Sequence, residues 1–335
     1  MKNKSSILKW ILIGVVVCLV LAFPAFAKNR YQVHIVNNIG IWILLSLGLN
    51  IAQGYGGQFN LALGALWGVG AYTAALLQTR LGVPFWINLP LGIIAGATMA
   101  AFVGLPSFKV RSHYLAIVTI GLGEVINLFL VNQDELTGGA LGINRIKPPS
   151  LFGFPIDTDE RFYYLILIMV ILGYLIGRQI VGHRIGRAFR ALRDDFQAAR
   201  AMGVNTGFYQ ILAFAISGAY AGAAGVLFAH WNSYISPDIF EFKSALIVLT
   251  MVMIGGMGSL PGSVVGTVLL LVLNEYLRVF EEWQLVGYGV AIIVVVLFVP
   301  GGVVELVRRF GNFRQRWSAG LTKEKSNMEE QQNVP

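Results

Sequence analysis

The sequence has few charged residues and almost no cysteine. Asp, Glu, Lys and Arg make up 13% of its 335 residues, about half the share that is usual in soluble proteins. The single cysteine, Cys18, excludes a disulfide framework and a cysteine metal cluster. Because 56% of the residues are hydrophobic, a soluble globular fold is excluded, and an integral membrane protein is expected.

The motifs of catalysis are missing too. The four histidines form no HxxH or HExxH spacing, and neither a GxSxG element nor a paired-carboxylate arrangement of the catalytic kind is found. A phosphate-binding GxxxxGK[ST] loop is absent, so the chain cannot bind ATP through such a loop of its own. No basic stripe alternates with aromatics, which excludes a nucleic-acid partner. We expect no catalytic residues, metal or cofactor in this chain. A transporter or channel is favoured over an enzyme.

Long apolar runs predict an all-α polytopic membrane fold. About ten runs, with a range of eight to ten, come near the ~20 residues that cross a bilayer core. They cover residues 8–26, 35–52, 62–79, 85–105, 114–131, 162–177, 208–230, 243–257, 262–280 and 284–300.

The first run has two interpretations. Ala25-Phe26-Ala27 looks like a signal-peptide cleavage site, but preceding lysines and an adequate length favour a retained span. We therefore predict a transmembrane domain over 1–302 and a disordered, basic cytoplasmic tail over 303–335.

Positive charge predicts the orientation. With both termini cytoplasmic, the basic 109–111 turn, the 178–205 segment and the tail lie inside, as the positive-inside rule requires. The acidic loop 132–161 then lies outside. Only Lys28 and Arg30 lie on the unfavourable side.

Residues 178–205 form a basic, amphipathic segment. Apolar residues recur at three- and four-residue steps (Ile185, Ala188, Phe189, Leu192, Phe196 and Ala199). Asp194, with Gln197 three residues on, predicts that a second helix begins there, and Gly203 predicts its end. We expect two short helices on the membrane surface. From the residues alone, a loop that only sets topology is an equal alternative.

Three polar features interrupt the apolar spans. Residues 50–60, NIAQGYGGQFN, predict unwound backbone that either lines a pathway or makes a cytoplasmic turn. The glycines of 255–262 favour a turn. Glu124, within a span, should face a cavity or a partner because a carboxylate in lipid is costly. It could line the pathway, stay protonated, pair with Asn127 or make a structural contact. The candidate pathway residues are Asn50, Gln53, Gly54, Gly56, Gly57, Gln58, Asn60, Glu124 and Asn127.

Five stretches in order resemble permease subunits of branched-chain amino acid ABC importers, most closely the LivM type. They are FKVRSHYLAIVTIGLGEVI (108–126), LTGGALGI (136–143), RIGRAFRALRDDFQAARAMGVN (184–205), LAFAISGAYAGAAGVLFAHWNSYISPDIF (212–240) and IGGMGSLPGSVVG (254–266). The resemblance runs from about Gly48 to Gly302.

The resemblance implies a bacterial inner-membrane importer with several chains. This subunit would pair with a LivH-like permease, two ATPase subunits that bind ATP and Mg²⁺, and a periplasmic or lipid-anchored binding protein. The outer 132–161 loop, with Thr137 to Gly139, and residues 232–242 would face that binding protein. The cytoplasmic segment would dock on an ATPase through its coupling residues, Arg193, Asp194, Asp195, Ala198, Ala199, Met202 and Gly203.

The first glycine-rich region departs from the family pattern. It carries Gln53, Gln58 and Asn60 where the family is mostly apolar. Other amino acids, or urea and short amides, therefore remain possible substrates. An ion-coupled secondary transporter is the main rival class, but a single buried acid and no clear internal repeat count against it.

Overall fold

The structure of the chain is a computed structural model that describes residues 21–24, 26, 29–108, 110, 113–151, 154–277, 289, 293 and 302. The predicted spans 8–26 and 284–300 lie outside this part apart from 21–24, 26, 289 and 293, and the predicted tail lies entirely outside it. All structural statements below concern the described residues.

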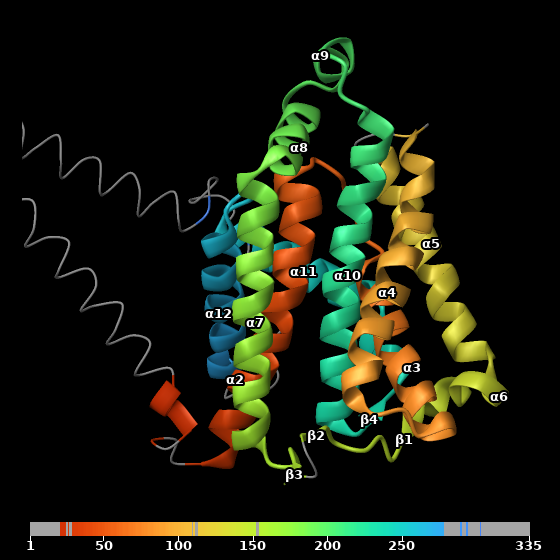
Figure 1. Cartoon of the computed structure of the whole chain (residues 1–335), viewed down its shortest axis with the longest axis vertical. Coiled ribbons are helices and arrows are strands. Elements are labelled where there is room, and N and C mark those ends of the chain that lie inside the picture. The colour runs from red at the N-terminus through yellow and green to blue at the C-terminus, as the bar shows by residue number, and fades with distance from the viewer. Residues whose placement is uncertain are drawn as a thin grey trace, which may run out of the picture.

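Eight long helices lie side by side in a bundle (Figure 1). Each matches one of the eight apolar runs predicted between residues 35 and 280, although the ends differ by several residues. They are α2 (Arg30–Leu49), α3 (Leu63–Leu81), α4 (Phe85–Gly104), α5 (His113–Asn132), α7 (Asp159–Gly182), α10 (Thr206–Asn232), α11 (Phe242–Gly255) and α12 (Leu260–Leu277).

Six helical segments are long and apolar enough to cross a membrane: Arg30–Tyr55, Phe85–Phe108, Tyr114–Asn132, Asp159–Gly182, Thr206–Asn232 and Leu260–Leu277. The helix α11, with 14 residues, is shorter than the ~20 that a span needs. The chain is thus a multi-pass membrane protein, while the count of about ten spans stays a prediction.

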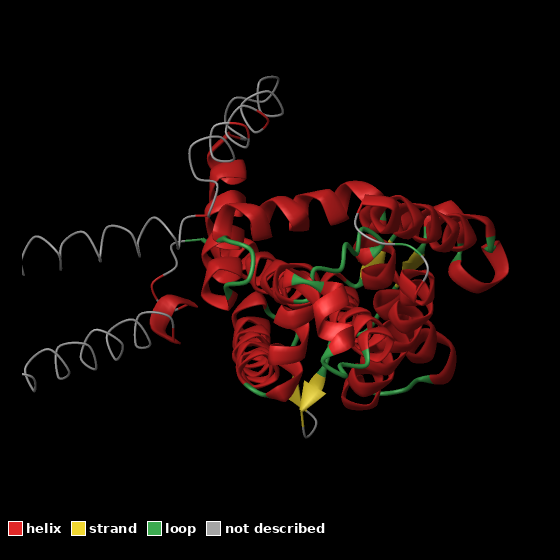
Figure 2. Cartoon of the chain, turned by 90° about the horizontal axis from the view of Figure 1, so that it is seen from above, coloured by secondary structure: helices red, strands yellow, loops and turns green. Residues whose placement is uncertain are grey.

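Two very small β-sheets qualify the prediction of an all-α fold, as Figure 2 shows. The strand β1 (Ile143–Asn144) pairs antiparallel with β4 (Tyr234–Ile235), and β2 (Ser150–Leu151) pairs with β3 (Phe154–Pro155). Strands of two residues give no period-two pattern in the sequence, which is why they were not predicted. The β1–β4 pair joins the two loops that were predicted to face outward.

The centre of the bundle is formed by α2 and α10. The helix α10 packs against α4, α3 and α2, and the apolar window of α2 is the most buried of the six. An aromatic cluster fills the core beside them: the Trp67 ring meets the Phe228 and Phe240 rings edge-on, with centroids 4.9 Å and 5.0 Å apart. The helices α2 and α10 are therefore central, whereas α5 attaches to the bundle mainly through α3.

Close contact between α4 and α10 depends on glycines four residues apart in each helix. A Cβ on Gly222 of α10 would meet the carbonyl oxygen of Gly92 of α4, and a Cβ on Gly96 would meet that of Gly218. Small residues let membrane helices approach until their backbones touch. At the contact between α4 and α10, glycine therefore allows the two helices to pack closely.

The bundle has two different ends (Figure 1). The short helices α8 (Arg184–Asp194) and α9 (Phe196–Ala201) lie at one end. The strands β1 to β4 and the short helix α6 (Asp134–Thr137) lie at the opposite end. The basic segment and the acidic loop are thus on opposite sides of the bundle, as the charge distribution predicts.

Candidate functional site

The helix α8 buries the apolar stripe that the sequence predicts. Its residues Ala188, Phe189 and Leu192 are buried, and the Phe189 ring packs against that of Tyr209 in α10, with centroids 6.2 Å apart. The helix packs on α7 and α10 at one end of the bundle, and its expected position on the membrane surface stays a prediction. An amphipathic pattern shows that one face is buried but not what covers it.

The turn between α8 and α9 depends on Asp195. Its carboxylate accepts hydrogen bonds from the backbone N–H groups of Gln197 and Ala198, at 2.8 Å and 3.0 Å, which is the geometry of an N-cap. The prediction that the second helix begins at Asp194 is wrong by one residue, since Asp194 is the last residue of α8. Because Asp194 and Asp195 are adjacent, the sequence pattern for an N-cap could be assigned to either residue.

Gly203 ends α9, as predicted. It has φ +81°, a left-handed conformation that favours glycine. The backbone N–H of Val204 donates to the carbonyl of Ala199, and that of Gly203 donates to the carbonyl of Arg200, both at 3.1 Å. This pair of bonds is the Schellman arrangement that satisfies the last carbonyls of a helix.

The exposed face of α9 is small and partly apolar. Ala198, Met202 and Gly203 are exposed, and Met202 is 84% exposed. Ala199 is only 5% exposed, so its predicted place in the same surface is wrong. Ala199 is the one buried residue of α9, which contacts α8 and α10. We call Ala198, Met202 and Gly203 the α9 tip.

Arg193, at the end of α8, reaches the core of the bundle. Its guanidinium Nη1 donates to the carbonyl oxygen of Gly54 at 2.8 Å. Its Nε and Nη2 donate to Asp194 Oδ1 at 3.2 Å and 3.1 Å. The predicted coupling segment and the predicted pathway segment are therefore in direct contact.

The region 50–60 is less unwound than predicted. Residues Asn50–Tyr55 continue α2 as a π-helix, and the backbone leaves the helix only from Gly56 until α3 begins at Leu63. Wide π-helical turns are rare and often occur at functional sites. The structure therefore keeps the polar residues of this region next to α8 rather than in a free loop.

Asn50 binds the second glycine-rich break. Its amide Nδ2 donates to the Ser259 carbonyl at 2.9 Å and to Ser263 Oγ at 2.6 Å. Its Oδ1 accepts from the backbone N–H of Gly258 at 2.8 Å. This break, predicted as a turn, does connect α11 to α12. We call Asn50, Gly54, Arg193, Gly258 and Ser263 the joint, because they tie α2, α8 and α12 together.

Serine and threonine extend the contact between α2 and α12. Ser46 Oγ lies 2.7 Å from Thr267 Oγ1, one helical turn away from the Asn50–Ser263 bond on both helices. These partners were not among the residues predicted from the sequence. The signal was present as polar residues four apart, Ser46 with Asn50 and Ser263 with Thr267, because such residues share a face of a helix.

Three other candidate pathway residues have unused polar atoms. Gln53 is 4% exposed, and neither polar atom of its side chain has a hydrogen-bond partner within the described chain. Asn60 Oδ1 and Asn127 Oδ1 are buried and unpaired as well, although Asn60 Nδ2 donates to Ser217 Oγ at 3.2 Å. Buried polar groups normally have partners. These atoms therefore lack a partner within the part of the chain that the structure describes.

The remaining residues of the 50–60 region have local roles. Gln58 Nε2 donates to the carbonyl of Gly56 at 3.1 Å. Gly57 has φ +66° and lies against Arg193. These positions shape the turn beside α8.

Glu124 and Asn127 are on different faces of α5. Glu124 is exposed, while Asn127 is buried, and Gly121, one turn before Glu124, has open space beside it. The helix α5 lies at an edge of the bundle (Figure 1). It meets the 56–62 segment at Thr119, whose Oγ1 accepts from the Leu61 N–H at 3.2 Å. Glu124 is thus directed away from the described part of the chain.

Sequence comparisons identify the family of the chain. A family described as "Branched-chain amino acid transport system / permease component" matches residues 31–299. The chain belongs to this permease family. The permease is similar to "High-affinity branched-chain amino acid transport system permease protein LivM" of Salmonella typhimurium, with 34% identity over 91% of the chain and 77% of the relative. The Escherichia coli K12 protein of the same name is 33% identical with the same coverage.

The permease is also similar to proteins named LivH. The Salmonella typhimurium LivH protein is 27% identical over 78% of the chain and 91% of the relative. No solved structure matches the permease.

Proposed function

We propose that this permease is the LivM-type subunit of an ATP-driven importer that moves branched-chain amino acids across a bacterial inner membrane. The family membership and the similarity to LivM proteins support the substrate class. The observation that carries the mechanism is the bond between Arg193 Nη1 and the Gly54 carbonyl. It connects an exposed terminal helix pair to the interior of the bundle.

The two ends of the bundle would meet different partners. We place α8 and α9 in the cytoplasm, where the α9 tip would dock on an ATPase subunit that binds ATP and Mg²⁺. The exposed part of the tip is small, apolar and bounded by charged residues, which suits a shallow groove on a partner. The end with α6 and the β1–β4 pair would face a substrate-binding protein. This chain would then have no catalytic role.

Movement would pass from α9 to the core through the joint. When ATP binding closes the ATPase subunits, a displaced α9 carries α8 with it, because the Asp195 cap fixes the turn between them. Arg193 then moves the Gly54 carbonyl at the end of α2, and Asn50 transfers the movement to α12 through Gly258 and Ser263. Interior helices of this kind shift between discrete packings rather than bending continuously.

The translocation pathway would lie between this permease and a second, LivH-like permease. Glu124 supports α5 as a helix of that interface, since an ionisable side chain exposed on a membrane helix is costly unless it meets water or protein. Gln53 and Asn60 are the strongest candidates for polar contacts within the 50–60 region, because their free amide atoms are buried. Asn50 would act in the joint instead.

The test is to purify the permease with a tag on its C-terminus and identify the chains that accompany it. The proposal expects a second permease and chains that contain GxxxxGK[ST]. Uptake of labelled leucine by cells that express these chains and the binding protein should compete with isoleucine and valine, but not with urea. A stable homo-oligomer without an ATPase would contradict the importer. An intact complex that takes up urea would contradict only the substrate.

A further inference from the structure

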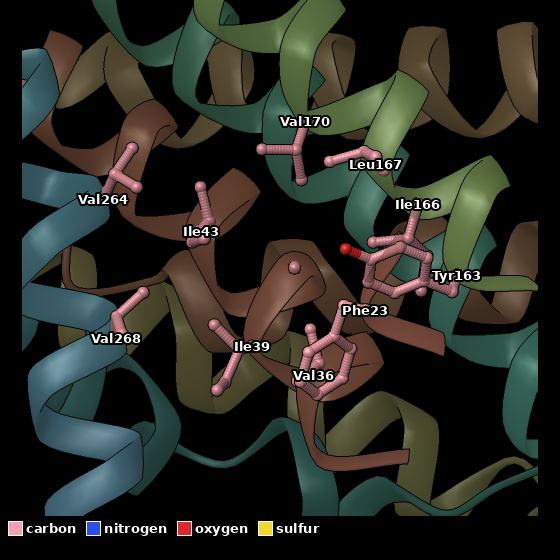
Figure 3. A pocket seen from close by; sticks show the side chains of 11 residues that line it. Phe23, Val36, Ile39, Ile43, Tyr163, Ile166, Leu167, Val170, Val264 and Val268 are labelled. Carbon is pink, nitrogen blue, oxygen red and sulfur yellow. The ribbon is translucent and has the colours of Figure 1, made fainter. Parts of the chain in front are cut away.

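An apolar pocket lies between α2, α7 and α12 (Figure 3). Its volume is about 440 Å³. Ile39 and Ile43 of α2 form its floor, with Leu167 and Val170 of α7 on one side and Val264 and Val268 of α12 on the other. Of its lining residues only Tyr163 has a polar side-chain atom. The pocket therefore suits an apolar occupant within the membrane.

The chain itself leads into this pocket. Phe23 lines it, and the Phe23 ring lies against that of Tyr163 at the start of α7, with centroids 6.1 Å apart. The Tyr164 hydroxyl donates to the carbonyl of Leu21 at 3.3 Å. Residues 21–24 are helical. The twenty residues before them lie outside the described part, and residues 8–20 read LKWILIGVVVCLV.

We infer that residues 8–20 occupy the apolar pocket as the first part of a transmembrane helix that includes the helical residues 21–24 and runs antiparallel to α7. The segment is apolar apart from Lys9 near its start, and the residues that follow it, Leu21 and Phe23, already contact α7 beside the pocket. A tethered segment has a high effective concentration at a site it can reach, which favours it over a free lipid chain or another subunit. The helix α7 has the least buried apolar window of the six, so it has a free face for this contact.

This inference makes the first apolar run a permanent part of the permease. Cleavage after Ala27 would remove Phe23 and with it one wall of the pocket. The segment would also support α7, which leads directly into α8. The inference does not depend on the substrate or on the ATPase docking site.

Cys18 permits a direct test because it is the only cysteine. Cys18 precedes Phe23 by five residues, about 7 Å along a helix. Leu167 and Val170 follow Tyr163 by about 6 Å and 10 Å along α7, so all three would lie at similar depth. Leu167→Cys and Val170→Cys variants are oxidised in native membranes of the assembled transporter, and linked peptides are identified by mass spectrometry. The control is Ile168→Cys, which is 53% exposed and does not line the pocket.

The expected result is a disulfide from Cys18 to position 167 or 170 with a yield several-fold above the control, because the bond requires close Cα atoms. A Val268→Cys variant tests the α12 side if the α7 variants fail to fold. Equal yields at 167, 168 and 170 would overturn the inference. So would a mature N-terminus that begins after Ala27. A disulfide from position 268 to a cysteine placed in 284–300, without one to Cys18, would also overturn the inference, because residues 284–300 would then occupy the pocket.

Discussion

Arg193 connects a terminal helix to the backbone of a central one. Its guanidinium satisfies the Gly54 carbonyl, and a Cβ added to Gly258 would lie 3.1 Å from its Nη1, so Arg193 lies beside both glycine-rich breaks. A net contribution of about 1.5–3 kcal/mol is typical of a hydrogen bond to a charged group. Because Asp194 shares the guanidinium and Arg193 is partly exposed, we expect the lower part of that range.

The first prediction concerns Arg193→Ala in the assembled transporter. We expect ATP hydrolysis to continue while the uptake per ATP falls by about tenfold, since ~1.4 kcal/mol corresponds to a factor of ten. Hydrolysis and uptake are measured together in proteoliposomes. The control is Arg187→Ala, an exposed arginine on the same helix, which should keep normal coupling. Equal losses of hydrolysis and uptake would contradict a role for Arg193 after docking.

Gly203 permits a second test at the α9 tip. Gly203→Asp should abolish transport while the permease stays inserted, because it places bulk and charge on the proposed docking surface. Gly203→Asn is the matched control, since Asn has the same shape and tolerates the left-handed conformation. ATPase binding, measured by copurification, should be lost in the Asp variant and weakened less in the Asn variant. Normal uptake by the Asp variant would refute the docking site.

At the scale of helices, the packing of α4 on α10 depends on the absence of side chains at Gly222 and Gly96. We predict that Gly222→Leu lowers the thermal stability of the purified permease, because overpacking costs about 1–3 kcal/mol even where side chains can yield, and here the neighbour is backbone. Gly121→Leu is the control, since nothing lies within 4 Å of its Cβ position. Similar melting curves for both variants would show that the α4–α10 contact is not tight.

The sequence predicted the long helices well because each is a continuous apolar run of membrane length. It also predicted the apolar stripe of α8 and the end of α9 at Gly203, which are local patterns. It could not predict that α8 packs on α7 and α10, or that Asn50 binds Ser263, because these contacts join residues far apart in the chain. Ala199 and Asp194 were assigned wrongly for a local reason. A shift of one residue along a helix changes the face on which a side chain lies and the residue that caps the helix.

At the scale of the whole molecule, Glu124 separates an ATP-driven importer from a proton-coupled carrier. In the importer, we predict that Glu124→Gln leaves uptake within about twofold, as is usual for substitutions outside special features. The amide keeps the shape of the side chain at an interface. A carrier that uses Glu124 as its proton relay should lose accumulation instead. Uptake into energised vesicles, with and without a proton uncoupler, measures this difference.

The most direct test of the account is to determine which subunit touches each end of the permease. In a Cys18→Ser background, Met202→Cys and Leu141→Cys carry a photo-crosslinker in the assembled complex. The two native side chains are both 84% exposed and lie at opposite ends, which makes them a matched pair. We predict that position 202 crosslinks to an ATPase subunit and position 141 does not. An ATPase crosslinked from position 141, or none from position 202, would contradict the account.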